Sequence, residues 1–376
     1  MLGLTISTPS PGADTTGSFL RRHSTAGILV VFVACELVLY QLTIGQGETL
    51  PFVLWSVVVF AGLFALALLL APEELVPKLC VAPTVLFLIL ITIGPFIYLL
   101  YISFFDVSVI NFRKEWTFIG LDNYVRVLTD SVVRQAFIRT VEYVVLAVGT
   151  ELLLGLALAL LLNWEFKGKG FFTTALVLPM MLTPIVVGMG WKYFMDYNTG
   201  FINSILNDIG LPRVPWLTSQ PLPLVDKIPL IGDFLVKQLN FKWAMVSIAF
   251  VDVWQWTPFV TLALIAALSA LPRAPYEAAT VDGASGWQIF RFVTLPQLRP
   301  TIMAVVLIRV MDAVKAFDTI WALFGNNTST RTLNISIYTF GLGVKNFSQG
   351  AALSVLTLIL MTVVSQAVIR LLTGKQ

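Results

Sequence analysis

Long apolar runs separated by short polar stretches dominate the hydrophobic pattern of this chain. An α-helix needs about 20 apolar residues to cross the hydrocarbon core of a bilayer, and several runs reach that length. We expect about eight spans, at residues 26–44, 51–71, 79–105, 140–162, 171–195, 243–268, 301–324 and 351–372. The pattern therefore predicts an all-α, polytopic membrane protein.

One polar stretch, residues 277–296, separates two of these runs. Its Asp282-Gly283 pair favours a break at a helix C-terminus, and Ser285 followed by Gln288 fits a capping box that starts a second helix. The Leu295-Pro296 pair is expected to end that second helix before the next apolar run begins. These signals predict two short helices joined by a turn at the membrane surface.

Composition supports a membrane protein and argues against several other classes. The chain is 57% hydrophobic and 12% charged, its mean hydropathy is +0.86, and its formal net charge of +3 is too small to indicate a nucleic-acid partner. Cys35 and Cys80 have no neighbouring Cys or His, so we interpret both as packing residues rather than metal ligands. The chain has no phosphate loop and no hydrolase or zinc motif, so we expect neither a catalytic centre nor a cofactor or metal on it.

Ionisable residues inside the predicted spans are the next informative feature. Each costs about 2.5–3.5 kcal/mol at the bilayer centre unless it faces a partner or a cavity. We interpret Glu36 and Glu151 as groups that bond one helix to another, because polar side chains often join membrane helices. The remaining candidates are Asp252, Arg309, Asp312, Lys315 and Asp318.

Asp252, Gln255, Trp256 and Phe259 lie on one face of a helix if the run around them is helical. A carboxylate, an amide and aromatic rings on one stripe suit a sugar, whose hydroxyls need hydrogen bonds and whose C–H faces pack on rings. Pro258 interrupts the helical hydrogen bonds there, which is tolerated next to protein or a water-filled cavity. The alternative is an ordinary kinked helix with interfacial tryptophans.

Arg309, Asp312, Lys315 and Asp318 follow one another at steps of three, so consecutive members can form ion pairs on one helix. The first and last lie on opposite sides of such a helix, so all four cannot line one cavity. Either the set is a structural ladder, or its outer part approaches a substrate path together with Trp321. The candidate pathway residues are Asp252, Trp254, Gln255, Trp256, Phe259, Lys315, Phe317, Asp318 and Trp191.

The polar stretch resembles the EAA loop of ABC importer permeases. Glu277-Ala278-Ala279 is followed after three residues by Gly283, and after nine more by Val293-Thr294-Leu295-Pro296, with Val293 where the family usually has Ile. The wider string Tyr276–Ser285 is similar to the carbohydrate branch of that family, and further similar strings extend the resemblance from about Val81 to the C-terminus. One departure is Gly325-Asn326, where the branch usually has Gly-Gly-Pro.

The resemblance implies a type I ABC importer permease fold and a set of partners. A second permease subunit, in a heterodimer, two ATPase subunits that carry ATP and Mg²⁺, and a periplasmic or lipid-anchored substrate-binding protein would complete the transporter. The loop would contact the ATPases and therefore face the cytoplasm, with Glu277 making a charged contact and Gly283 permitting a sharp turn. The implied coupling residues are Glu277, Ala278, Ala279, Asp282, Gly283, Leu295 and Pro296.

The predicted organisation has four parts: a cytoplasmic leader at residues 1–25, an additional two-helix hairpin at 26–78, a six-helix core at 79–372 with its coupling loop at 272–300, and a cytoplasmic tail at 373–376. The resemblance implies a location in the bacterial inner membrane, surrounded by lipid. An even number of spans puts both termini on one side, and Arg21-Arg22 before the first span favours the cytoplasm.

The resulting hypothesis is a permease subunit that moves a sugar, sugar derivative or polyol from the periplasm to the cytoplasm. The alternative is an ion-coupled secondary transporter or channel that uses the charges of Asp252, Lys315 and Asp318. A membrane enzyme is less well supported than either, because the chain lacks the corresponding motifs.

Overall fold

The computed structural model describes residue 62, residues 75–220 and residues 242–373. Most of the N-terminal predictions therefore lie outside the described residues. These are the leader, Glu36 and the two spans at 26–44 and 51–71, except for residue 62. Of the predicted hairpin at 26–78, the structure describes only residue 62 and residues 75–78. The chain divides into two compact units, Met1–Ile97 and Tyr98–Gln376.

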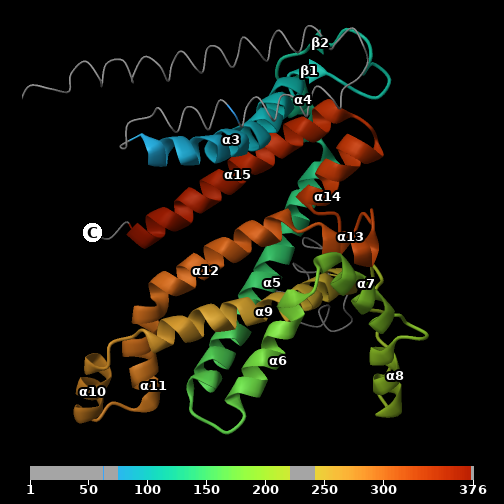
Figure 1. Cartoon of the computed structure of the whole chain (residues 1–376). Coiled ribbons are helices and arrows are strands. Elements are labelled where there is room, and N and C mark those ends of the chain that lie inside the picture. The colour runs from blue at the N-terminus through green and yellow to red at the C-terminus, as the bar shows by residue number, and fades with distance from the viewer. Residues whose placement is uncertain (1–61, 63–74, 221–241, 374–376) are drawn as a thin grey trace, which may run out of the picture. The chain divides into compact units, whose positions relative to one another are not determined.

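The described part of the chain is almost entirely helical (Figure 1). The first helices and the one small sheet among the described residues are α3 (Val76–Ile102), β1 (Phe105–Asp106), β2 (Thr117–Phe118), α4 (Asp122–Thr129), α5 (Ser131–Asn163), α6 (Lys169–Met181), α7 (Pro184–Phe194) and α8 (Phe201–Asp208). The later elements are α9 (Trp243–Ser269), α10 (Ala274–Val281), α11 (Gly286–Ile289), η3 (Phe290–Thr294), α12 (Leu295–Lys315), α13 (Asp318–Phe324), α14 (Leu333–Tyr338), η4 (Thr339–Gly343) and α15 (Phe347–Thr373).

Five described helices are long and apolar enough to cross a membrane, and a sixth span results if the bent pair α6–α7 is counted as one. The predicted spans near 79–105, 140–162, 243–268 and 351–372 each correspond to one of these helices. The polytopic, all-α prediction is confirmed. The total of eight is not, because two predicted spans lie outside the described residues.

The prediction of one straight span at 171–195 is wrong, because α6 and α7 meet at an angle of 99°. Leu182 and Thr183 are extended, with ψ values of 143° and 137°. Pro184 explains the break, since the residue before a proline avoids the helical region and a proline fits the first turn of a new helix.

Two further predictions around α12 are wrong. The Leu295-Pro296 pair does not end a helix: α11, η3 and α12 form one continuous segment, Gly286–Lys315. The i→i+5 hydrogen bond from Leu295 N to Phe290 O shifts the register where the proline ring would otherwise meet a carbonyl. At the other end, α12 stops at Lys315, and Asp318 starts α13, so the four charges at steps of three do not share a helix.

The core of the second unit forms where α5, α9 and α12 lie together (Figure 1). Gly155 of α5 allows the closest approach, because a Cβ atom there would lie 2.6 Å from Val260 Cγ1 of α9. The helix α9 is continuous through Pro258, which is buried among its neighbours. The predicted break at this proline is therefore limited to one missing backbone donor.

The turn after α7 is fixed by polar contacts outside the spans. The Asp196 carboxylate accepts hydrogen bonds from Thr199 N at 2.8 Å, Thr199 Oγ1 at 2.9 Å and Asn198 N at 3.0 Å, and these bonds lower its pKa. Asn203 of α8 is buried, accepts from Val214 N at 2.9 Å and donates to Val214 O at 3.0 Å. These contacts tie the segment after α8 to the end of α7.

Candidate functional site

The polar stretch folds as one short helix, the predicted turn, and the start of the long segment Gly286–Lys315 in place of the predicted second short helix. The helix α10 ends at Val281, and Gly283 has a φ of +72°, a left-handed conformation that favours glycine. Ser285 then caps α11: Gln288 N donates to Ser285 Oγ at 3.4 Å, and Ser285 N donates to Gln288 Oε1 at 2.7 Å. The predicted capping box is confirmed, and it fixes where the second helix starts.

A side-chain contact fixes the first helix against the second. Tyr276 of α10 and Thr294 of η3 form a hydrogen bond of 3.1 Å between their hydroxyl groups. Because Thr294 is continuous with α12, the turn is attached directly to a membrane-spanning helix. The loop is therefore joined to α12 both through the chain and through this hydrogen bond.

The surface of this loop is open. Glu277, Ala278, Asp282 and Gly283 are exposed, as are Leu295 and Pro296, whereas Ala279 is partly buried. The most exposed large apolar side chains of this loop are Val281 at 88%, Phe292 at 69% and Trp287 at 66%. We did not select these three from the sequence, although their signal was present: they are apolar residues in an otherwise polar stretch. Exposed apolar groups beside a charge are typical of a protein-docking surface.

A second feature is a buried ion cluster at the meeting point of α5, α9 and α12. Arg309 donates from Nε to Glu151 Oε2 at 2.6 Å and from Nη2 to Glu151 Oε1 at 2.9 Å and Asp252 Oδ2 at 2.8 Å. The exposed fractions of the three side chains are 2% for Arg309, 0% for Glu151 and 6% for Asp252. One cation thus satisfies carboxylates from two other helices, and Glu151 has the helix-bonding role expected for it.

Aromatic and amide groups surround this cluster. The Arg309 guanidinium lies 4.9 Å from the centre of the Trp256 ring, a cation–π distance. Gln255 is buried and donates from Nε2 to Leu182 O at 3.0 Å, which satisfies a carbonyl at the break between α6 and α7. Asp252 and Gln255 are therefore engaged within the chain in this conformation, and Phe259 packs in an apolar cluster with α5 and α12.

The other predicted pathway residues fall into two further places. Trp191 of α7 and Trp254 of α9 form an edge-to-face pair with 5.4 Å between their ring centres. Lys315, Phe317 and Asp318 flank the break between α12 and α13, and Lys315 pairs with Asp312 at 3.5 Å while both remain about half exposed. The structure thus divides the candidate pathway residues among a buried cluster, a tryptophan pair and a group at a helix break.

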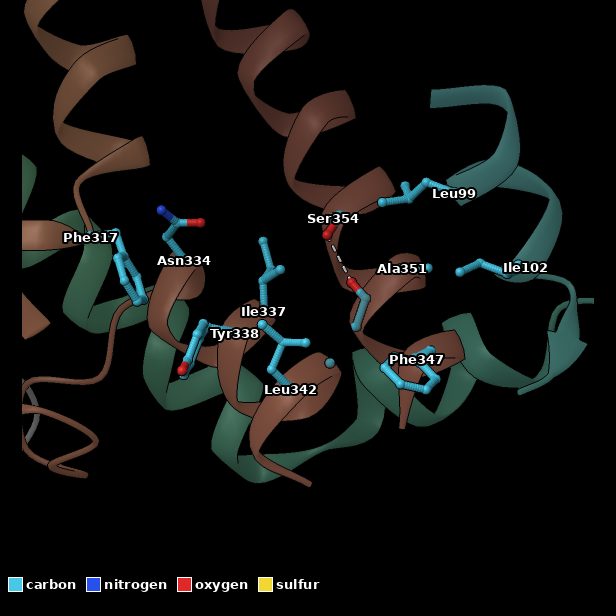
Figure 2. A pocket seen from close by; sticks show the side chains of 12 residues that line it. Leu99, Ile102, Phe317, Asn334, Ile337, Tyr338, Leu342, Phe347, Ala351 and Ser354 are labelled. Carbon is cyan, nitrogen blue, oxygen red and sulfur yellow. Dashed lines mark hydrogen bonds between the residues drawn. The ribbon is translucent and has the colours of Figure 1, made fainter. Parts of the chain in front are cut away.

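A cavity of about 430 Å³ opens beside that break, between the C-terminal end of α3, α14, η4 and α15 (Figure 2). Phe317, Asn334 and Tyr338 line one end, and apolar side chains such as Leu342 and Phe347 line the remainder. Phe317 stacks on Trp321 with 5.4 Å between ring centres, and the Tyr338 ring lies 5.1 Å from that of Phe317. In the described residues, no cluster of three His, Cys, Asp or Glu side chains is suited to hold a metal ion.

Comparison with known proteins identifies the family. Residues 151–375 match the family described as the inner membrane component of binding-protein-dependent transport systems. A probable ABC transporter permease of Sinorhizobium fredii is 35% identical over 268 residues, covering 71% of this chain and 80% of that protein. The trehalose/maltose transport system permease of Thermococcus litoralis is 33% identical, covering 71% and 83% of the two chains.

Solved structures show the same fold. A bacterial ABC transporter that imports the acidic polysaccharide alginate has a chain that matches with a TM-score of 0.66 and 22% identity, covering 81% of this chain and 97% of that chain. The family match, the relatives and the apolar helices agree with the resemblance seen in the sequence. The chain belongs to the family of inner membrane components of binding-protein-dependent transport systems, and it is a multi-pass ABC transporter permease.

Proposed function

We propose that this permease imports a sugar, sugar derivative or polyol from the periplasm to the cytoplasm, using ATP that is hydrolysed on separate subunits. The observation that carries the proposal is the coupling loop, which is exposed, is held by the Ser285 capping box and the Tyr276–Thr294 hydrogen bond, and runs directly into the 30-residue segment Gly286–Lys315. The substrate class is supported by relatives named as permeases for trehalose/maltose and for sulfoquinovosyl glycerol, the latter 29% identical over 81% of this chain.

The loop would serve as a docking lever for an ATPase subunit. Glu277 offers a charge, while Val281, Trp287 and Phe292 offer apolar area for a groove on the partner. Asp282 and Gly283 hold the turn that separates the two helices, and the small Ala278 and Ala279 side chains let the first helix lie close to its partner. ATP and Mg²⁺ would bind to the ATPases, and the loop would lie on the cytoplasmic side together with both chain termini.

The buried ion cluster would connect movement of the loop to the membrane-spanning helices. Movement of the loop is transmitted along α11, η3 and α12, which are continuous up to Arg309 and beyond. Arg309 is bonded to Glu151 of α5 and Asp252 of α9, so the three helices would tilt as one body. Such tilting would change access from one membrane face to the other, around a site shared with a second permease subunit.

A periplasmic or lipid-anchored binding protein would deliver the substrate. One solved relative of the fold is a bacterial alginate ABC transporter in complex with an alginate-bound periplasmic protein, at 22% identity and a TM-score of 0.63. In our proposal, Trp191, Trp254 and Trp256, with the groups at the α12–α13 break, lie along the route that the substrate takes after delivery.

The coupling role is tested by Glu277→Lys in the transporter reconstituted with its ATPase and binding-protein partners. We expect at least tenfold slower ATP-driven uptake of labelled trehalose, maltose and sorbitol, because the charge at the docking surface is reversed. Glu165→Lys, at another exposed glutamate, in the connection between α5 and α6, is the matched control and should leave uptake unchanged. Normal uptake by the Glu277 variant would refute the coupling role.

The same reconstituted transporter distinguishes ATP-driven import from the ion-coupled alternative. Asp252 is bound by Arg309 and lies in the buried cluster, whereas Lys315 and Asp318 are exposed at the helix break, so these charges do not form one ion site. Uptake that needs ATP and continues after a protonophore and a sodium ionophore are added supports the importer. Uptake that persists without ATP and is abolished by either ionophore supports the alternative.

A further inference from the structure

The cavity beside the α12–α13 break has two chemically different ends. Ser354 and the apolar residues of α15 and η4 line one part, while Phe317, Asn334 and Tyr338 line the other (Figure 2). Its volume of about 430 Å³ falls in the range of small-molecule sites, about 300–1,000 Å³. The cavity is therefore large enough for a ring-sized ligand.

Charged side chains of α12 lie near one lining residue of the cavity, Asn334, which binds the Lys315 carbonyl. Asp312 and Lys315 belong to a membrane-spanning helix, yet their side chains are 46% and 57% exposed. Exposed charges on a spanning helix do not face lipid, because burial in hydrocarbon is costly, so this side of α12 faces water or protein. The break at Ala316 and Phe317 agrees, since non-helical backbone at membrane depth occurs beside protein or water-filled cavities.

Asn334 connects this charged side of α12 to the cavity. Its Nδ2 donates to Lys315 O at 2.6 Å, which holds the amide at the cavity edge and satisfies a carbonyl at the end of α12. One N–H is used in this bond, which leaves a second N–H and the amide oxygen for a ligand. The nearby ring faces of Phe317 and Tyr338 offer apolar platforms, and the Tyr338 hydroxyl adds a donor and an acceptor.

We propose that this cavity is a substrate subsite that holds one neutral sugar or polyol unit on its way through the permease. Hydroxyl groups would bind the Asn334 amide and the Tyr338 hydroxyl, and a C–H face would stack on Phe317 or Tyr338. Neutral substrates are favoured because Asp312 already balances the charge of Lys315. The inference rests on the proposed function for its ligand class, and it assigns residues Asn334, Tyr338 and Ser354 that the sequence did not suggest.

The binding test uses saturation-transfer NMR with trehalose, sorbitol and sodium glucuronate on the complete transporter in nanodiscs. We expect saturation transfer to trehalose and sorbitol, and less to glucuronate. The transfer to the neutral probes should fall at least fivefold in Tyr338→Ala and Asn334→Leu, and by less in Tyr338→Phe, which loses the hydroxyl but retains the ring. Leu358→Ala, at an exposed leucine of α15 that does not line the cavity, is the matched control and should keep the signal. Absence of transfer to both neutral probes, or transfer that all these variants keep, overturns the subsite.

Accessibility separates a sugar from other occupants. Ser354→Cys, in a chain with Cys35 and Cys80 replaced by serine, should react with a charged, water-soluble methanethiosulfonate, and excess trehalose should slow the reaction at least threefold. Reaction with a lipid-soluble maleimide alone would show an acyl chain in the cavity. Failure of both reagents in the assembled complex, with reaction in the isolated permease, would show that a partner helix fills it. Either result overturns the proposal.

The two proposals fail in different experiments. In one outcome, Glu277→Lys abolishes ATP-driven uptake, whereas Tyr338→Ala and Asn334→Leu keep it with an unchanged KM. That outcome would support the importer proposal and refute the subsite. In the opposite outcome, the NMR saturation transfer to trehalose depends on Tyr338, but uptake does not depend on ATP. That outcome would support the subsite and refute the ATP-driven mechanism.

Discussion

Replacing Arg309 with methionine is the sharpest test of how the spans are held together. The guanidinium makes three charge-assisted hydrogen bonds of 2.6–2.9 Å to Glu151 and Asp252, and it lies over Trp256 at 4.9 Å. Methionine keeps much of the aliphatic volume and removes the charge. The two carboxylates would then remain buried without their cation, because none of these side chains is more than 6% exposed.

The expected cost follows from these contacts. Hydrogen bonds to charged groups contribute about 1.5–3 kcal/mol each, which for three bonds gives a gross value of about 4.5–9 kcal/mol. Breaking a buried ion pair by removing one partner costs about 3–5 kcal/mol in measured cases, since local relaxation recovers part of the gross value. We therefore expect Arg309→Met to lower the free energy of unfolding by about 3–5 kcal/mol.

The measurement is equilibrium unfolding in mixed detergent micelles, followed by tryptophan fluorescence. Arg299→Met, an exposed arginine on the same helix, is the matched control and should change the free energy of unfolding by less than about 0.5 kcal/mol. A combined Arg309→Met, Glu151→Leu, Asp252→Leu variant should recover most of the loss, because no unpaired charge remains. A loss below about 1 kcal/mol in Arg309→Met would refute the reasoning.

Three other substitutions test separate features. Gly155→Ala should cost about 1–3 kcal/mol of stability by forcing α5 away from Val260, whereas Gly149→Ala, with open space around it, should not destabilise; both are measured by the same unfolding assay. Gly283→Val should slow ATP-driven uptake several-fold because its φ is +72°, and Gly283→Asn, which tolerates that conformation, should restore most of it; equal rates would contradict the role of the turn. Asn203→Leu should speed proteolysis of the segment after α8, since the groups that Asn203 binds lose their partner; unchanged cleavage would contradict this.

The sequence was informative wherever a local signal determines local structure. Hydropathy located α9 to within one residue: the predicted span is 243–268, and the observed helix is Trp243–Ser269. The turn at Gly283 and the capping box of Ser285 were predicted from residues only a few positions apart. These features depend on neighbouring backbone groups, so they survive whatever the rest of the chain does.

Hydropathy alone did not reveal how the helices are broken. An apolar run has the same composition whether it is straight or bent by 99°, and the deciding signal at the α6–α7 bend was the single residue Pro184. At Pro296 the same kind of residue had the opposite outcome, because the π-type register of η3 lets the helix continue. A proline marks a possible break, and the surrounding hydrogen bonds decide whether it occurs.

The candidate site was only partly visible because its partners are distant in the chain. Asp252 and Arg309 were recognised as costly charges, but they are 57 residues apart, and Glu151 is 158 residues from Arg309. No periodicity connects groups on three helices, so their mutual contact required the structure. The roles of the pathway residues stay predictions.

The five-residue π-helix Phe290–Thr294 determines the rotation of the coupling loop about the helix axis relative to the buried Arg309. Each residue of an α-helix turns the chain by ~100°, so one additional residue absorbed in a wider turn rotates everything before it by a comparable angle. The docking face of the loop and the face of α12 that carries Arg309 are therefore aligned by a single inserted residue. Deleting one residue of this segment other than Phe292 would keep the side chains that we propose as the docking surface and point them in a different direction.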